Sequence, residues 1–124
     1  MDMDYHGKLI LIAEDDESSY ILLKTLLNRI GIITLLAKNG TETITMCKEV
    51  PGIDLILMDI SMPEINGLDA AKIIKQAYPE IKIVAQTAYS VFGDKERALL
   101  GGCDDYISKP IKKSVLYSVI SKYL

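Results

Sequence analysis

A short apolar run near the middle of the chain leads directly into an acidic residue. Leu55–Met58 consists of four apolar residues without polar alternation, and Asp59 follows at once. Such a run is typical of a strand that is buried on both faces, as strands are in a parallel sheet. Leu9–Ala13 has the same character and is followed by Glu14 and Asp15. The two runs predict an α/β protein with a buried parallel sheet.

The remaining segments read as further strands that alternate with amphipathic helices. From Ser18 to Arg29, apolar residues recur at three- and four-residue steps, which is the helical period. Asn39-Gly40 is a turn, and we expect Thr41 to cap the helix that follows it. Short loops and right-handed crossovers join such elements into one doubly wound sheet. The expected strands cover residues 9–13, 32–37, 55–58, 81–86 and 105–108, and the expected helices 18–29, 41–50, 68–77, 92–100 and 111–123.

Length and composition limit the classes of protein to consider. The chain has 124 residues, 49% of them hydrophobic, so we expect one domain at 8–124 after a polar tail or linker remnant at 1–7. A net charge of −3 argues against direct nucleic-acid binding, which requires a basic face. No apolar run approaches the roughly 20 residues of a membrane span, and no signal peptide is evident. Cys47 and Cys103 match no metal spacing, so we expect packed, reduced thiols in a cytoplasmic protein.

In a parallel sheet, the residues that follow each strand lie along the same edge, where ligands of open α/β sheets bind. Each of these residues also has an ordinary explanation. An aspartate often begins a loop, and acids at the start of a helix complement its dipole. Their joint placement favours a functional site. The residues at this edge are Glu14, Asp15, Asp59, Ser61, Thr87 and Lys109.

The side chains at this edge suit phosphoryl transfer. Carboxylates that lie close together repel one another, which either raises a pKa or holds a cation. Oxygen ligands without histidine or thiolate favour a hard ion such as Mg²⁺. A carboxylate beside such an ion can act as the nucleophile, while Thr87 and Lys109 bind phosphoryl oxygens.

Several motifs make the chain resemble a response-regulator receiver domain of bacterial two-component signalling. The resemblance spans almost the whole chain, and its motifs are specific in combination. It implies a five-stranded (βα)5 fold of the flavodoxin or CheY type with strand order 2-1-3-4-5. The matching segments are Leu11-Ile12-Ala13-Glu14-Asp15-Asp16-Glu17, Leu57-Met58-Asp59-Ile60-Ser61-Met62-Pro63, Asn66-Gly67, Ala85-Gln86-Thr87-Ala88 and Gly102-Cys103-Asp104-Asp105-Tyr106-Ile107-Ser108-Lys109-Pro110.

The resemblance implies that Asp59 is the phosphoacceptor. It also implies a site for Mg²⁺ or Mn²⁺ formed by Asp15, Asp59 and the backbone carbonyl of Ser61. Glu14 would act on the ion mainly through water. The phosphoryl donor would be a phosphohistidine on a histidine kinase or a phosphotransfer domain.

The resemblance also implies a switch. Thr87 is the switch hydroxyl, Lys109 pairs with the phosphoryl group, and the rotamer of Tyr106 follows the state of Thr87. Phosphorylation would shift the face formed by the fourth helix, the fifth strand and the fifth helix. The Lys109-Pro110 peptide bond is expected to be cis.

Two positions in the family tune the lifetime of the acyl phosphate, and here they are Ser61 and Tyr89. Neither side chain is a carboxylate or an amide that could orient an attacking water well, and Tyr89 is bulky. We therefore expect slow autodephosphorylation.

The resemblance favours the receiver of a hybrid sensor histidine kinase, on the cytoplasmic side of the membrane. A stand-alone single-domain regulator and a phosphorylation-independent docking module are the alternatives. The domain would catalyse phosphoryl transfer to its own Asp59, as a monomer or a weak phosphorylation-linked dimer.

Two rival functions share the expected fold but fit the residues poorly. A flavodoxin-like module needs a phosphate-binding loop after the first strand, where Glu14–Glu17 would repel a phosphate. A phosphatase with an aspartate nucleophile usually has a second acid two residues later, where this chain has Ser61.

Overall fold

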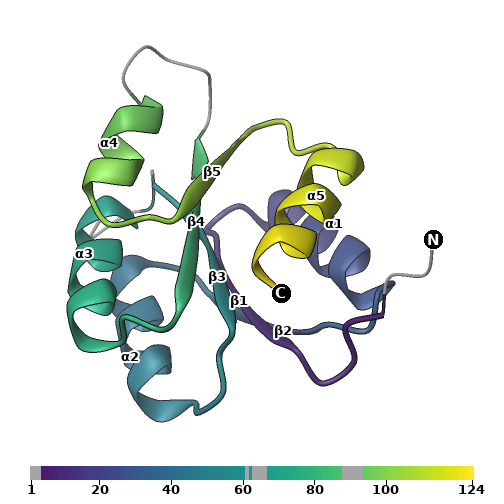
Figure 1. Ribbon diagram of the computed structural model, residues 1–124, viewed down its shortest axis with the longest axis horizontal. Coiled ribbons are helices and arrows are strands. Elements are labelled where there is room, and N and C mark those ends of the chain that lie inside the picture. The colour runs from purple at the N-terminus through teal and green to yellow at the C-terminus, as the bar shows by residue number, and fades with distance from the viewer. Residues whose placement is uncertain (1–3, 61, 63–66, 88–93) are drawn as a thin grey trace.

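The computed structural model describes residues 4–60, 62, 67–87 and 94–124 (Figure 1). This part of the chain forms one sheet of five parallel strands in the order β2-β1-β3-β4-β5. The predicted doubly wound α/β fold is therefore confirmed, and each strand lies within about one residue of its expected bounds. The strands are β1 (Leu9–Ala13), β2 (Ile33–Ala37), β3 (Leu55–Asp59), β4 (Lys82–Thr87) and β5 (Asp105–Ser108).

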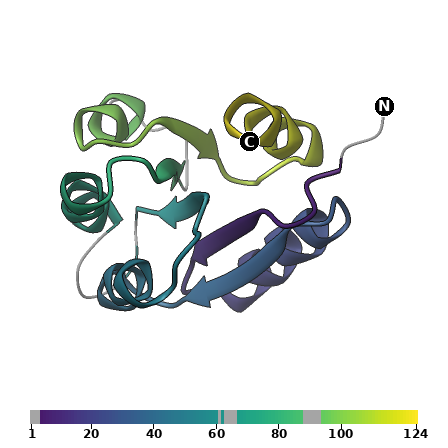
Figure 2. The same ribbon diagram turned by 60° about the horizontal axis from the view of Figure 1, so that its bottom comes forward.

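Helices cover both faces of the sheet. Figures 1 and 2 show α1 and α5 on one face and α2, α3 and α4 on the other. Because both faces are covered, β3 at the centre is buried along its whole length. The helices are α1 (Glu17–Asn28), α2 (Gly40–Glu49), α3 (Gly67–Ala77), α4 (Asp94–Leu100) and α5 (Lys113–Tyr123).

The core divides into two clusters, one on each face of the sheet. Leu57 on β3 and Val84 on β4 belong to the cluster that also contains the buried residues of α1 and α5. The residues that follow them, Met58 and Ala85, belong to the opposite cluster, with buried residues of α2, α3 and α4. Side chains therefore alternate between the two faces along these strands, as the pleat requires.

The starts of α1 and α2 are capped by side chains. Asp16 precedes α1, and its carboxylate accepts a hydrogen bond from the Ser19 backbone N–H at 2.9 Å. For α2 the expected cap at Thr41 is wrong, because the helix starts earlier and Asn39 is the N-cap. Asn39 accepts from the Glu42 N–H at 2.7 Å, and the Glu42 carboxylate accepts from the Asn39 amide at 3.2 Å. This reciprocal pair stabilises the first turn of α2.

Both cysteines are buried and free, as the sequence predicts. Burial raises the pKa of Cys47 and of Cys103 to about 11, so both thiols stay protonated at neutral pH. Within the described ranges, no helix has the length and apolar character needed to cross a membrane.

Candidate functional site

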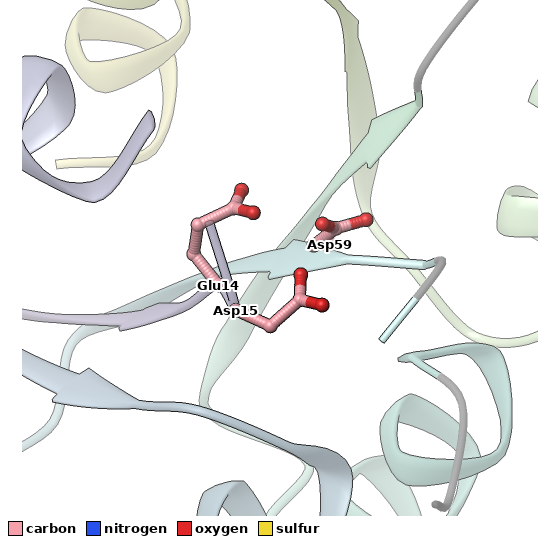
Figure 3. Close-up of side chains that lie close together, drawn as sticks. All are labelled: Glu14, Asp15 and Asp59. Atoms are coloured by element: carbon pink, nitrogen blue, oxygen red, sulfur yellow. The ribbon is translucent and has the colours of Figure 1, made fainter. Parts of the chain in front are cut away.

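Three carboxylates converge at the carboxyl edge of the sheet. Glu14 and Asp15 follow β1, and Asp59 is the last residue of the adjacent strand β3 (Figure 3). One carboxylate oxygen of each residue lies within 4.8 Å of the others. Glu14 is 1% exposed and Asp59 5% exposed, whereas Asp15 faces solvent. An oxygen-only cluster that is open on one side fits a hard divalent cation such as Mg²⁺.

Lys109 follows the edge strand β5, and its side chain reaches this cluster. Its Nζ donates to Glu14 Oε2 at 2.9 Å and to Asp59 Oδ2 at 3.3 Å. Burial alone would lower the pKa of Lys109, but the hydrogen bond to Glu14 and the charge of Asp59 raise it above its ordinary value. The ammonium is therefore a permanent positive charge beside the candidate phosphoacceptor.

Glu14 is electrostatically unusual. Burial raises its pKa from 4.5 to about 7, against the opposing effect of the Lys109 hydrogen bond, and the neighbouring Asp59 carboxyl raises it further. The site therefore holds more negative charge than a single ammonium neutralises. A second cation would relieve this repulsion.

Thr87 and Lys109 are connected through the backbone. Thr87 ends β4 and is 1% exposed, and its carbonyl accepts a hydrogen bond from the Lys109 N–H at 2.7 Å. The Lys109-Pro110 peptide bond is cis, as expected. Tyr106, on the neighbouring strand β5, is half-buried against the core cluster of α2, α3 and α4. The structure thus brings Thr87 and Lys109 to the same edge as the carboxylates, whereas Tyr106 lies further inside the sheet, where it pairs with Ala85 of β4.

Two expected site residues lie outside the described residues. These are Ser61, with its proposed carbonyl ligand, and Tyr89, with its proposed shielding of the acyl phosphate. Both roles stay predictions.

Two further residues of the edge were missed by the sequence reasoning. A Cβ placed on Gly67, the first residue of α3, would lie 2.2 Å from the carbonyl oxygen of Asp59. Gly67 therefore lets α3 pack directly on the backbone of the candidate phosphoacceptor. The second residue, Gln86, is the one fully buried amide of β4. The available signals were the Asn66-Gly67 pair and the single polar residue between Ala85 and Thr87.

The family model described as "Response regulator receiver domain" matches residues 10–121. The chain belongs to this family. The match includes both acidic strand ends, Thr87 and Lys109, so the receiver family and the site geometry concern the same residues.

Curated relatives and solved structures agree with this assignment. The polar-differentiation response regulator DivK of Brucella anthropi is 39% identical over 119 residues, which cover 94% of this chain and 96% of DivK. A chain from the co-crystal structure of the Saccharomyces cerevisiae phosphotransfer protein Ypd1 with the Ssk1 receiver domain has a TM-score of 0.89. It is 34% identical, and the match covers 96% of this chain and 90% of that one. The receiver domain of sensor histidine kinase PA1611 from Pseudomonas aeruginosa, with a magnesium ion in its active site cleft, has a TM-score of 0.86. It is 28% identical, over 94% of this chain and 97% of that one.

Proposed function

We propose that this receiver domain takes a phosphoryl group from a phosphohistidine onto Asp59. The observation that carries the proposal is the setting of the Asp59 carboxylate, at the end of β3 beside the Lys109 ammonium and close to the Glu14 and Asp15 carboxylates. A carboxylate in this position has one cation beside it and the ligands for another.

In the proposed reaction, an Asp59 carboxylate oxygen attacks phosphorus and forms an O–P bond. The P–N bond to the donor imidazole breaks, and its electron pair stays on that ring nitrogen. The other ring nitrogen of the phosphohistidine carries a proton, so the imidazole leaves as a neutral ring. The product is an acyl phosphate on Asp59. Lys109 pairs with one phosphoryl oxygen, and the Thr87 hydroxyl donates to another.

A divalent cation, Mg²⁺ or Mn²⁺, would supply positive charge to the phosphoryl oxygens. The residues that would hold it are Asp15, Asp59 and the Ser61 backbone carbonyl, with Glu14 contributing through water. The described carboxylates fit this role because they offer only oxygen ligands within a short span.

We further propose that phosphorylation switches the surface formed by α4, β5 and α5. Thr87 would move toward the phosphoryl group, and the ring of Tyr106 would turn inward with it. The backbone hydrogen bond from Lys109 to Thr87 supports this coupling, because it joins the ends of β4 and β5. Such a local change in charge shifts the balance between two conformations.

The partner would be a histidine kinase or a phosphotransfer domain. The Ssk1 receiver crystallised with the phosphotransfer protein Ypd1 supports this class of partner. We also propose that residues 8–124 form one receiver unit and that this unit lies in the cytoplasm. The PA1611 receiver supports a hybrid kinase, whereas DivK, matched over 96% of its own length, supports the stand-alone alternative.

Labelling with a small phosphodonor tests the proposed function. We expect acetyl phosphate with Mg²⁺ to add one phosphoryl group to the wild-type protein and none to Asp59→Asn, as measured by intact mass. Asp16→Asn is the matched control, because asparagine retains the helix cap. It should be labelled like the wild type. Labelling that persists in Asp59→Asn would contradict the proposal, and a wild type that gains no mass would leave a docking module as the better function.

A further inference from the structure

Gln86 is a buried amide without a hydrogen-bond partner. The residue is 0% exposed, and neither Oε1 nor Nε2 of its side chain has a hydrogen-bond partner. The surrounding strand residues Val84 and Ala85 are apolar core residues. Burying an amide in such a place without a partner is costly, so an apolar side chain would suit the resting structure better.

The register of the sheet places Gln86 beside the phosphoacceptor. Gln86 on β4 pairs with Asp59 on β3 and with Ile107 on β5. Asp59 comes two residues after Leu57, and Gln86 two after Val84. Leu57, Val84 and Ile107 all belong to the core cluster that faces α1 and α5. By strand alternation, Asp59 and Gln86 therefore lie side by side on that face.

Lys109 spans the same part of the sheet. It follows β5, on one side of Gln86, and its ammonium contacts Asp59 and Glu14, which lie on the other side. The Lys109 side chain thus extends across the end of β4, where Gln86 is found. No other buried side-chain atom without a partner is found among the described residues, apart from the Thr34 hydroxyl on the edge strand β2.

The resting contacts of Lys109 conflict with cation binding. Its ammonium holds oxygens of Glu14 and Asp59, and these two carboxylates belong to the cluster that would hold a divalent ion. Two cations at such close range repel one another, so Lys109 has to give up part of its contact with the carboxylates. The Lys109 side chain is only 23% exposed, so an ammonium that leaves a carboxylate needs another acceptor on its buried side.

We propose that Gln86 is a positioning residue that accepts the Lys109 ammonium when a divalent cation occupies the carboxylate cluster. The Gln86 Oε1 accepts from Lys109 Nζ, and Nε2 can donate to the adjacent Asp59 carboxylate. One amide thus complements both charges and keeps Lys109 beside the phosphoacceptor. This role rests on the cation-dependent phosphoacceptor function proposed above.

Calorimetric titration with Mg²⁺ tests the role in the intact domain. In Gln86→Met, an unbranched apolar side chain replaces the amide, and we expect Mg²⁺ to bind about ten-fold more weakly, as the loss of one hydrogen bond to a charged group implies. Without Mg²⁺ the same variant should unfold at the same temperature as the wild type or higher. Thr34→Val is the matched control, because it removes another buried unpartnered atom away from the carboxylates. It should leave Mg²⁺ binding unchanged.

A Gln86→Met variant that binds Mg²⁺ within two-fold of the wild type would overturn the proposed role. If Gln86→Met does not fold, NMR of the wild type decides. The side-chain amide signals of Gln86 should shift and gain protection from exchange when Mg²⁺ is added, and unchanged signals would overturn the role.

Labelling of the same wild-type sample with acetyl phosphate separates the two proposals. A wild type that is labelled while Gln86→Met binds Mg²⁺ normally refutes only the role of Gln86. A wild type that is not labelled refutes the phosphoacceptor function, and the Mg²⁺ titration still decides the role of Gln86 toward Lys109.

Discussion

The Nζ of Lys109 donates to Oε2 of Glu14 at 2.9 Å, joining the segments that follow β5 and β1 across the width of the site. The Glu14 side chain is completely buried and that of Lys109 is 23% exposed, so solvent screens this ion pair only weakly. In the resting domain Lys109 therefore holds the carboxylates together against their mutual repulsion.

Removing the ammonium should destabilise the domain. We expect Lys109→Met to lower the free energy of unfolding by on the order of 3 kcal/mol in Mg²⁺-free buffer at pH 8, because it leaves buried carboxylates without their partner. Urea denaturation measures the change. Lys122→Met is the matched control, since Lys122 is 65% exposed and lies 3.5 Å from Asp105. Its effect should stay below about 1 kcal/mol, and equal effects of the two substitutions would contradict this view of Lys109.

The raised pKa of Glu14 makes stability depend on pH. Between the ordinary pKa of 4.5 and the folded value of about 7, the folded domain keeps a proton that the unfolded chain releases. The free energy of unfolding should therefore fall as pH rises through this window, by on the order of 2 kcal/mol without Mg²⁺. Glu14→Gln should remove most of this slope, whereas Glu49→Gln, at the exposed end of α2, should retain it. A slope that survives Glu14→Gln would assign the effect to another group.

Gly67 should tolerate no side chain. In Gly67→Ala the added Cβ meets the Asp59 carbonyl at 2.2 Å, so α3 or the end of β3 has to move. We expect a loss of about 2–3 kcal/mol in thermal or urea unfolding, as overpacking costs, and slower labelling by acetyl phosphate. Gly52→Ala is a control for backbone strain without a clash, because Gly52 has a φ of +84° and nothing within 4 Å of its Cβ position. Its cost should be about 1 kcal/mol, with normal labelling.

Tyr89 should prolong the life of the acyl phosphate. Tyr89 stands two residues after Thr87 in the sequence, and a bulky side chain at this position hinders the water that would attack the acyl phosphate. We expect slow decay of the phosphorylated wild type, faster decay in Tyr89→Ala, and little change in Tyr89→Phe, which retains the ring. Decay is followed by intact mass after removal of the phosphodonor. Loss of the phosphoryl group from the wild type within seconds would contradict the prediction.

The fold could be predicted from sequence because its main signals are local. Unbroken apolar runs such as Leu55–Met58 identify strands that are buried on both faces, and their alternation with amphipathic helices leaves few topologies. Asp59 and Lys109 could be placed at one edge for the same reason. The cap of α2 was misassigned because Asn39 and Thr41 are both good caps, and the choice depends on how the chain leaves β2.

The contacts of Gly67 and Gln86 could not be predicted in this way. The need for glycine at position 67 arises from the approach of α3 to the Asp59 carbonyl, which involves two elements rather than one pattern. The place of Gln86 beside Asp59 depends on the register of β3 against β4. From the sequence alone, Gln86 is only a polar residue near the end of a strand, and its neighbour on β3 is unknown.

Locating the phosphoryl group on the chain tests most directly whether Asp59 is the phosphoacceptor. The wild-type domain is phosphorylated with acetyl phosphate and Mg²⁺, the acyl phosphate is reduced with borohydride, and the peptides are mapped by mass spectrometry. We expect the modified residue to be Asp59 alone, with Glu14, Asp15 and Asp16 unchanged. Modification at any of those three acids, with Asp59 intact, would contradict the proposed phosphoacceptor.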